Sequence, residues 1–530
     1  MFVLMVHIRT LLFFFCCLFP SLSAGTFPLL EGFSAYSSPL GPKTQRAQAY
    51  FNQGMVLYYG FNYLEAARSF EEAAKLEPTC AMCYWGEAAA YDQSTSSPED
   101  KWFVQGKEAI LKAERLIRNS TPEQKGLILA LSKKFRAVDA GNDLAVDKYI
   151  AALKKLSEKY PNAPDIRTLY IQAFMDKNDL MHGMHEGRPT GVTKEILDTL
   201  QTGLTLSPKH VGLLHFNIHA LEACNMPEQA LSSATALDGL VPGSGHLQHM
   251  PAHIYFALGR YHEATEANQR GVAADAKLLN SAAIRESDFA GFYLHNYYYL
   301  FGSLVMEGRL NDAMEAANDL IKRLNNGDMM TDRYITDTFT AVPYLLLARF
   351  GKWDEILQIN PPPAQRGYVF SRSVYAYAVG LAFAHTGQPE KAKKYLKSLK
   401  DRIRFHNLDE RNVRIKMLGM AFLDLQAQLE TDPNQAVAAL RKAVMIEDNT
   451  NLDMTVWYLP MRLSLGAALL KAGKPQQAEK VYLEDLKKHP ENGWALSGLM
   501  QSLQAQHKDV GDLPQRIQKA WQHADPDLKR

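Results

Sequence analysis

The histidines of this chain are concentrated in one region of the sequence. Ten of the 16 histidines lie between positions 182 and 295, and six of the ten form three short groups. The groups are His215 with His219, His246 with His249 and His253, and His295 alone. Imidazole is a common ligand of zinc, copper and iron in proteins. The grouping therefore predicts a metal-binding or catalytic site. A repeat array that only presented a binding surface would not need histidines clustered in this way.

The first group lies in the run HFNIHALE, which begins at His215 and ends at Glu222. His215, His219 and Glu222 stand at positions i, i+4 and i+7. At about 100° per residue they fall within about 60° of one another on a helix. Cys224 falls about 180° from His215, so we do not expect its thiol to join them. One helix face thus presents three side chains that can bind metal.

The second group lies in GHLQHMPAHIY, where spacings of three and four residues separate His246, His249 and His253. Pro251 interrupts this run, because proline has no N–H to donate and clashes with the carbonyl four residues back. We expect a helix to begin or kink near Pro251, with His246 and His249 in an entry loop and His253 in the first turn. His295 is expected on the first helix of the following hairpin, so that neighbouring hairpins bring the groups together.

Three interpretations of the histidine cluster follow. In the first, the cluster holds a divalent transition metal such as zinc, copper or iron in a binding or scaffold protein; with more than four ligands it could hold two ions or leave a position open. In the second, the chain is a metal-dependent hydrolase or oxidoreductase in which Glu222 or a histidine acts as general base. In the third, the histidines form a structural polar seam in a protein-interaction scaffold. No nucleophile elbow or phosphate loop assigns a catalytic residue.

A repeated pattern of small and aromatic residues predicts the elements that position these side chains. The spacing of a 34-residue tetratricopeptide repeat is matched by Gly54, Ala66, Phe70, Ala73 and Pro78. The twelve-residue step from glycine to alanine recurs at Gly380 with Ala392 and at Gly466 with Ala478. Small residues let two antiparallel helices approach, and the aromatic ring fills the space to the next hairpin. The sequence predicts an all-α superhelical solenoid of such hairpins.

The ends of the chain differ in composition from the array. Residues 1–24 contain the apolar run 11–19 followed by small residues, which indicates a cleaved signal peptide and a secreted protein, or a periplasmic one in a bacterium. Residues 25–43 are a lead-in segment. We expect an N-terminal array with the histidine cluster at 44–360, and a C-terminal array with a capping helix bearing Trp521 at 361–530. A membrane anchor is the alternative for the N-terminal apolar run, although its uncharged part has only about half of the roughly 20 residues that a helix needs to cross a bilayer; no later segment is long and apolar enough to span.

The charge balance narrows the expected partners. With 58 basic and 57 acidic side chains, the chain has no net field that would attract nucleic acid. We expect a protein or small-molecule ligand in the concave groove. Cys80 and Cys83 are expected to be buried thiols or a local disulfide, with a redox pair or metal ligands as the alternative. Asn119 begins a glycosylation sequon. Around Trp457, Tyr458 and Arg462 aromatic rings and a cation are close together; hairpin core is the expected role, and a small pocket is the alternative.

Four blocks carry a family resemblance: CAMCYWGEA from Cys80, HFNIHALEA from His215, GHLQHMPAHIYFALGRY from Gly245, and ENGWALSGL from Glu491. They resemble a family of secreted tetratricopeptide-repeat proteins with HxxxHxxE and GHLxHMPxHI motifs, distantly similar to tetratricopeptide repeat protein 38. The resemblance implies a right-handed solenoid and a grouping of His215, His219 and Glu222 with His246, His249, His253 and His295. Family members typically carry a further histidine three residues after the one matching His295. Tyr298 stands there, which implies one fewer imidazole in this chain.

Overall fold

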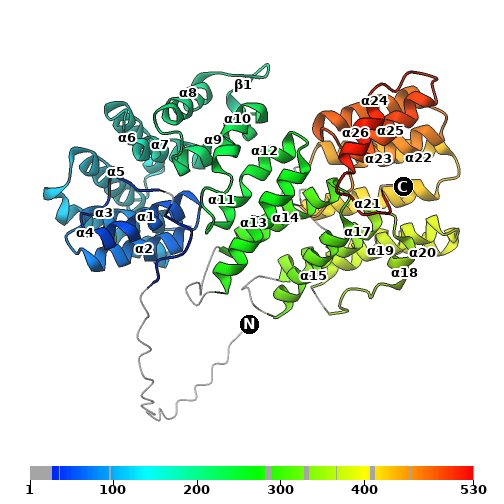
Figure 1. Ribbon diagram of the computed structural model, residues 1–530. Helices are drawn as coiled ribbons and strands as arrows, with labels where there is room; N and C mark the ends of the chain where they lie inside the picture. Colours follow the sequence, from blue (N-terminus) through cyan, green and yellow to red (C-terminus); the bar gives the residue numbers. More distant parts are fainter. Residues whose placement is uncertain are drawn as a thin grey trace, which may run out of the picture.

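The computed structural model describes residues 27–34, 36–94, 97–280, 289–326, 333–365, 367–405, 412–450, 452 and 455–528. The expected signal peptide at 1–24 lies outside them. The described residues form an almost entirely helical array, as predicted (Figure 1). In Figure 1 the array runs from α1–α4 on the left, through α9–α14 in the centre, to α21–α26 on the right.

The first helices are α1 (Gln45–Tyr59), α2 (Tyr63–Leu76), α3 (Ala81–Gln93), α4 (Lys101–Leu116), α5 (Pro122–Asp139), α6 (Ala145–Lys159), α7 (Pro164–Lys177) and α8 (Gly191–Leu206). The central helices are α9 (Val211–Ala223), α10 (Pro227–Leu237), α11 (Gly245–His249), α12 (Pro251–Ala257), α13 (Tyr261–Leu279), α14 (Phe289–Met306) and α15 (Leu310–Asn326). The last helices are α16 (Arg333–Thr340), α17 (Val342–Arg349), α18 (Trp353–Gln358), α19 (Val369–His385), α20 (Pro389–Phe405), α21 (Val413–Leu429), α22 (Pro433–Asp448), α23 (Met461–Lys471), α24 (Pro475–Lys488), α25 (Gly493–Gln504) and α26 (Leu513–Ala520).

The helices pack as the glycine and aromatic positions predict. The ring of Phe70, on α2, lies between Gly54 of α1 and Gly86 of α3. A Cβ atom at Gly54 would stand 2.7 Å from that ring, and one at Gly86 2.6 Å. Near the other end of the chain, Tyr482 occupies the same place between Gly466 and Gly498. Because glycine has no side chain, three consecutive helices can pack around one aromatic ring. This is the packing expected between a tetratricopeptide hairpin and the first helix of the next hairpin.

A short β-hairpin interrupts the helical array between α7 and α8. Strands β1 (Met184–His185) and β2 (Arg188–Pro189) pair antiparallel. Glu186 and Gly187 join them with φ of 49° and 74°. Two successive residues of positive φ fit the twist of a tight hairpin, and the glycine takes that conformation at little cost. The short 3₁₀ helices η1 (Ile117–Asn119) and η2 (Leu180–Gly183) complete the described elements.

The prediction of an entry loop before Pro251 is wrong. His246 and His249 lie within α11, whose first turn is capped by Ser244 Oγ, an acceptor of the Leu247 N–H. Met250 keeps right-handed helical angles between α11 and α12, and Pro251 is the first residue of α12. A proline at that position gives up a backbone donor that the start of a helix leaves unpaired anyway. The run therefore stays close to one helix, interrupted by a single residue.

One buried carboxylate is prominent among the contacts that bind the lead-in segment to the array. Asp165 of α7 accepts hydrogen bonds of 2.6 Å from the hydroxyls of Tyr36, Ser38 and Tyr59. Nε2 of His210 lies 3.2 Å from the same carboxylate, and Nδ1 of His210 accepts the Leu213 N–H that begins α9. Asp165 thus connects the segment before α1 with α1, α7 and α9.

The chain's C-terminal cap returns to the middle of the array. Trp521 stands directly after α26, and its ring lies edge-on to Trp494 with centroids 4.5 Å apart. The Asp525 N–H donates to the Gly308 carbonyl at 3.0 Å, in the turn between α14 and α15. The Tyr261 hydroxyl donates to the Pro490 carbonyl at 2.7 Å. These contacts hold the last repeats beside α12–α15 (Figure 1).

The hydrophobic core follows the array in three clusters. The first extends from Phe33 to Leu278, the second from Tyr293 to Met461, and the third from Ala427 to Leu513. The division of the array near residue 360 stays a prediction. Within the ranges given above, no helix combines the length and the apolar character that crossing a membrane requires.

Candidate metal centre

The first helices of three successive hairpins bring all six predicted histidines together. His215 and His219 lie on α9, His246 and His249 on α11, His253 on α12 and His295 on α14. Two groups form, each with nitrogen atoms within 4.8 Å of one another. The first is His215, His219 and His246, and the second is His249, His253 and His295. The convergence expected from the sequence is therefore found.

The second group is the tighter of the two. Nε2 of His249 lies 2.9 Å from Nε2 of His253 and 2.9 Å from Nε2 of His295. His249 is fully buried, and His253 and His295 are 4% and 8% exposed. Three imidazole nitrogens thus converge in a space that is closed to bulk water.

The first group adjoins it. Nε2 of His215 lies 3.1 Å from Nε2 of His246, and the rings of His215 and His219 have centroids 4.8 Å apart. Across the two groups, the ring centroids of His246 and His295 are 5.8 Å apart and those of His219 and His253 are 5.7 Å apart. The six imidazoles therefore form one continuous cluster.

Hydrogen bonds on the outside of the cluster fix where the imidazole protons lie. Nδ1 of His253 is 2.7 Å from Oε1 of Glu222, and Nδ1 of His215 is 2.6 Å from the Tyr59 carbonyl oxygen. Nδ1 of His249 is 2.6 Å from Oδ1 of Asn268. Carboxylate and carbonyl oxygens only accept, so each Nδ1 donates its N–H. The neutral rings then have lone pairs on Nε2, directed into the cluster.

Glu222 lies at the edge of the cluster. Its second oxygen is 4.0 Å from Nδ1 of His219. Burial alone would raise the pKa of Glu222, but its electrostatic interaction with the adjacent His253 ring and the hydrogen bond from that ring hold the pKa below its usual value. Although the sequence placed Glu222 among the candidate ligands, the geometry makes it an ionised acceptor that orients His253. Carboxylates in this place orient metal-binding histidines and raise their basicity.

Burial keeps five of the six imidazoles neutral. It lowers the pKa of His215, His246 and His249 well below the usual histidine value, and neighbouring histidines add to the effect. Burial also lowers the pKa of His219 to about 4 and that of His295 to about 2. Charging one ring disfavours charging the next in a dry space. Near neutral pH the cluster offers lone pairs and few protons.

Close backbone contacts hold α11 in place. A Cβ atom on Gly271 of α13 would lie 2.9 Å from the Gly245 carbonyl oxygen and 3.0 Å from Cβ of His249. Asp275 of α13 is buried and accepts from the Asn296 side chain at 2.6 Å. Burial raises the pKa of Asp275 well above its usual value, although bonds from Asn296 and the Gly245 N–H oppose this. Glycine at 245 and 271 thus lets α13 press against the histidine helix.

The sequence did not indicate four neighbours of the cluster. Tyr59, the last residue of α1, and Phe61, between α1 and α2, reach it from about 150 positions away in the chain. Asn268 and Tyr299 reach it from α13 and α14. The Phe61 ring is 4.7 Å from that of His215 and 5.2 Å from that of His246. Phe61 has a φ of 63°, uncommon for a bulky residue and often found near functional sites. Neither that φ nor the contact can be read from local sequence spacing.

Tyr298, at the position of the family's extra histidine, points elsewhere. Its ring packs against Phe339 of α16 with centroids 4.8 Å apart. The next residue, Tyr299, instead packs on His253, His249 and His295 at 4.3, 5.0 and 5.1 Å. Position 298 therefore belongs to the side of α14 that faces α16, and the six histidines form their cluster without it.

Comparison with known proteins identifies the repeat. A tetratricopeptide-repeat family model matches residues 47–80. The chain contains a tetratricopeptide repeat. Similar solved structures include a human IFIT1 dimer with m7Gppp-AAAA, 10% identical over 88% of this chain and 94% of that chain, with a TM-score of 0.34. A human IFIT1 dimer with PPP-AAAA is 11% identical over 91% of each chain, with a TM-score of 0.28. A search of curated proteins returns no match.

A pocket in the tetratricopeptide array leads to one edge of the cluster. It has a volume of about 580 Å³, and His219 and Glu222 form part of its wall together with Phe61, Asp176 and Asp179. The Nε2 atom of His219 has no hydrogen-bond partner among the described residues. The cluster is thus buried on most sides and approached from one.

A third group of metal-capable side chains lies where the C-terminal cap meets α13. Nδ1 of His262 is 2.8 Å from Oε1 of Glu307, and the rings of His262 and His523 are stacked with centroids 3.7 Å apart. The nitrogen and oxygen atoms of the three residues lie within 4.8 Å of one another. The sequence analysis did not single out these residues, because they are far apart in the chain.

The other residues singled out in the sequence lie apart from the cluster. Cys80 and Cys83 form a disulfide at the start of α3, where the Cys83 N–H is 3.0 Å from the Cys80 sulfur. Cys224 is a buried free thiol. Asn119 is exposed at the end of η1. Glycosylation at Asn119 stays a prediction.

Proposed function

We propose that this chain is a tetratricopeptide-type binding protein whose histidine cluster holds divalent transition-metal ions. The observation that carries the proposal is the pair of 2.9 Å distances from Nε2 of His249 to Nε2 of His253 and of His295. The Nδ1 protons of His249 and His253 are directed outward, so two lone pairs face each other. Neutral rings in this arrangement repel unless a cation lies between them.

The donor set indicates the class of ion. The six ligands in the cluster are imidazoles, without a thiolate, and imidazoles suit zinc, copper or iron. Calcium and magnesium prefer carboxylate oxygens, and none of these six residues has a carboxylate. Each triad alone supplies three ligands, one fewer than a tetrahedral structural zinc site uses. We infer two ions, one in each triad, with a coordination position left open.

The proposed setting is extracellular, or periplasmic in a bacterium. The leader-like residues 1–24 support it, and so does the Cys80–Cys83 disulfide, since disulfides persist mainly in oxidising compartments. The exposed position of Asn119 suits its glycosylation. We propose a protein or a small molecule, and no nucleic acid, as ligand of the concave groove, because acidic and basic side chains are balanced.

The test is the metal content of the full-length protein, purified without chelators and measured by mass spectrometry. We expect about two equivalents in the wild type, and loss of at least one in the His249→Ala, His253→Ala double variant. A matched control changes the exposed His182 and His507 to alanine and should keep the metal. Wild-type protein that neither retains nor takes up zinc, copper or iron would leave the polar seam as the explanation.

A metal-dependent enzyme is the second candidate. The 580 Å³ pocket favours it, because the pocket reaches His219 and Glu222 and would admit a substrate. A bound ion would act as a Lewis acid and lower the pKa of bound water. Glu222 is ionised and close enough to the pocket to accept a proton, while Phe61 covers the adjoining side of the cluster.

Cobalt-substituted protein distinguishes the two candidates. If a coordination position is open to the pocket, azide should change the visible absorption of the cobalt at millimolar concentration. A spectrum that azide leaves unchanged would indicate closed coordination and a structural role for the ion.

A further inference from the structure

One helix is strongly basic although the whole chain is almost neutral. Helix α20 contains seven lysine or arginine residues and only two acidic ones, Glu390 and Asp401, whereas the chain as a whole has 58 basic and 57 acidic residues. The helix packs against α19 as the second member of a hairpin and lies on the right of the array in Figure 1. A local positive field therefore exists at this place despite the balanced net charge.

Four of the cations form a single row along the helix, which we call the α20 row. The α20 row consists of Lys393, Lys397, Lys400 and Arg404. Their positions, i, i+4, i+7 and i+11, fall within about 60° of one another on a helix. All four residues are exposed, whereas Ala392 and Leu399 are buried on another side of α20. At 1.5 Å per residue the row is about 16 Å long, with one cation at about every 5.5 Å.

Acidic side chains neutralise little of this row. Lys393 pairs with Glu390 at 2.7 Å, but the two side chains are 57% and 81% exposed, so solvent weakens the pair. The other three members form no ion pair with a carboxylate within the part of the chain that the structure describes. The row therefore presents its positive charge to solvent.

The α20 row is unfavourable for the helix that carries it. Like charges three or four residues apart repel on a helix surface, and the row contains three such steps. Lys391 and Lys393 lie in or beside the first turn, where the helix dipole disfavours a cation; only the cations of the last turn, such as Arg404, are favoured by it. Because folding gains little from this arrangement, the row indicates a partner that supplies the negative charge.

The remaining side chains of α20 narrow the class of polyanion. Proteins that bind single-stranded nucleic acid stack its bases on aromatic rings, but Tyr395, the aromatic residue in the middle of α20, is half-buried. A helix that lies on a membrane inserts large apolar side chains, and none of the large exposed apolar residues of the described chain belongs to α20. Segments rich in lysine and arginine are also typical of heparin-binding sites. A sulfated glycan therefore fits the row best.

We propose that the α20 row binds a linear sulfated glycan through its four cations. Sulfate groups stay ionised at neutral pH, and a row of cations that neutralises them releases the counterions condensed on the glycan, which favours binding. The extracellular setting proposed above is where such glycans occur. The site requires neither the histidine cluster nor the concave groove.

Three oligomers of equal length test the class of ligand by calorimetric titration of the full-length protein. A heparin decasaccharide carries sulfate, a hyaluronan decasaccharide carries only carboxylate, and a ten-residue oligothymidylate carries phosphate and bases. We expect heparin to bind at least tenfold more tightly than the other two, and about tenfold more weakly in 0.3 M than in 0.1 M NaCl. Undetectable heparin binding, or an equal affinity for hyaluronan or oligothymidylate, would overturn the proposal.

A quadruple variant, Lys393→Gln, Lys397→Gln, Lys400→Gln, Arg404→Gln, tests the location. It changes only exposed positions and removes the repulsion within the row, so its melting temperature should be close to or above that of the wild type. Its affinity for the heparin decasaccharide should be at least tenfold lower, and heparin should raise the melting temperature of the wild type but not of the variant.

The matched control removes the same amount of charge from exposed, ion-paired lysines on other helices and loops. It is the quadruple variant Lys75→Gln, Lys194→Gln, Lys277→Gln, Lys508→Gln. We expect the control to bind heparin within about twofold of the wild type, because screening limits attraction between distant charges. If the row variant keeps the wild-type affinity, or loses no more than the control does, the α20 row is not the binding site.

Discussion

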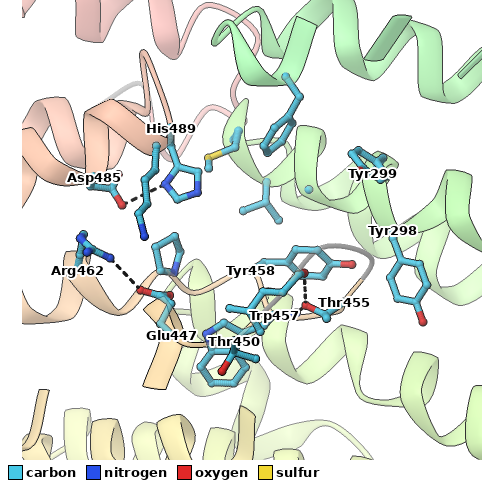
Figure 2. Close-up of a pocket in the computed structure, with 17 residues that line it drawn as sticks. Tyr298, Tyr299, Glu447, Thr450, Thr455, Trp457, Tyr458, Arg462, Asp485 and His489 are labelled. Atoms are coloured by element: carbon cyan, nitrogen blue, oxygen red, sulfur yellow. Dashed lines mark hydrogen bonds and ion pairs between the residues drawn. The ribbon is translucent and has the colours of Figure 1, made fainter. Parts of the chain in front are cut away.

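The ring of Tyr299 lies 4.3 Å, centroid to centroid, from the ring of His253, and it also forms part of the wall of a cavity of about 340 Å³ that Trp457 and Tyr458 line as well (Figure 2). One side chain of α14 therefore separates the histidine cluster from the cavity beside Trp457. Position 299 has this role because it is one helical turn beyond His295, and so lies on the same face of α14.

Replacing Tyr299 should expose the cluster. Tyr299→Ala removes the ring that covers three histidines, so water and chelators reach the ions more easily. We expect zinc transfer to a chromogenic chelator to be at least tenfold faster than in the wild type. Tyr299→Phe keeps the ring and should transfer zinc at nearly the wild-type rate. Similar rates in Tyr299→Ala and the wild type would show that the ring does not seal the site.

Replacing Glu222 should weaken metal binding without removing a ligand. Glu222→Gln keeps the shape of the side chain but loses the charge that orients His253 and raises its basicity. The expected loss of zinc affinity is about 10- to 100-fold, measured by competition with a chelator of known affinity. Glu228→Gln, at an exposed position of α10, is the control. An unchanged affinity in Glu222→Gln would mean that the hydrogen bond to His253 does not support metal binding.

The half-buried Glu87 should make stability depend on pH. Burial, with the nearby charge of Glu71, raises the pKa of Glu87 to about 8. The unfolded chain, with a pKa near 4.5, releases this proton first, so Glu87 contributes stability at low pH that is lost as pH rises from about 4.5 through about 8. Between pH 5.5 and 7.5 the free energy of unfolding of the wild type should fall by about 2 kcal/mol relative to Glu87→Gln.

Urea unfolding of both proteins at several pH values checks this prediction. Comparison with Glu87→Gln removes the contributions of other titrating groups, which are the same in both. Glu99→Gln, at an exposed position, should follow the wild type at every pH. If the difference between the wild type and Glu87→Gln is independent of pH, the Glu87 carboxyl is solvated in the folded protein.

The Asp165 network should be a large contributor to stability. Asp165→Asn replaces the carboxylate by an uncharged amide that can accept fewer hydrogen bonds. The three hydroxyl groups and His210 that now bond to the carboxylate would then lose part of their bonding. We expect the free energy of unfolding to fall by about 3 kcal/mol or more. Tyr36→Phe removes one of the bonds and should cost about 1.5 to 3 kcal/mol. A loss below 1 kcal/mol in Asp165→Asn would show that the lead-in segment is held by other contacts.

Local spacing was enough to predict the helices and the groups of ligands within each of them. The step from Gly54 to Phe70 is set by how closely two adjacent helices can approach, and the i, i+4, i+7 positions of His215, His219 and Glu222 follow from helical periodicity. The expected start of a helix near Pro251 is confirmed, because Pro251 is the first residue of α12, where a backbone N–H needs no partner. The entry loop expected before it is wrong, because His246 and His249 lie in the helix α11.

The sequence by itself determined the repeat, the helices and the histidines that share each helix face, because these depend on interactions within about a turn or one hairpin. Only the tertiary structure decided that α9, α11, α12 and α14 direct six imidazoles at one another, that Phe61 and Asn268 support them, and that Tyr299 separates them from a second cavity. Such contacts depend on the angles at which hairpins stack and on the return of the C-terminal repeats to α14. Those angles result from many small packing contacts between hairpins, and no local sequence motif predicts their combined effect.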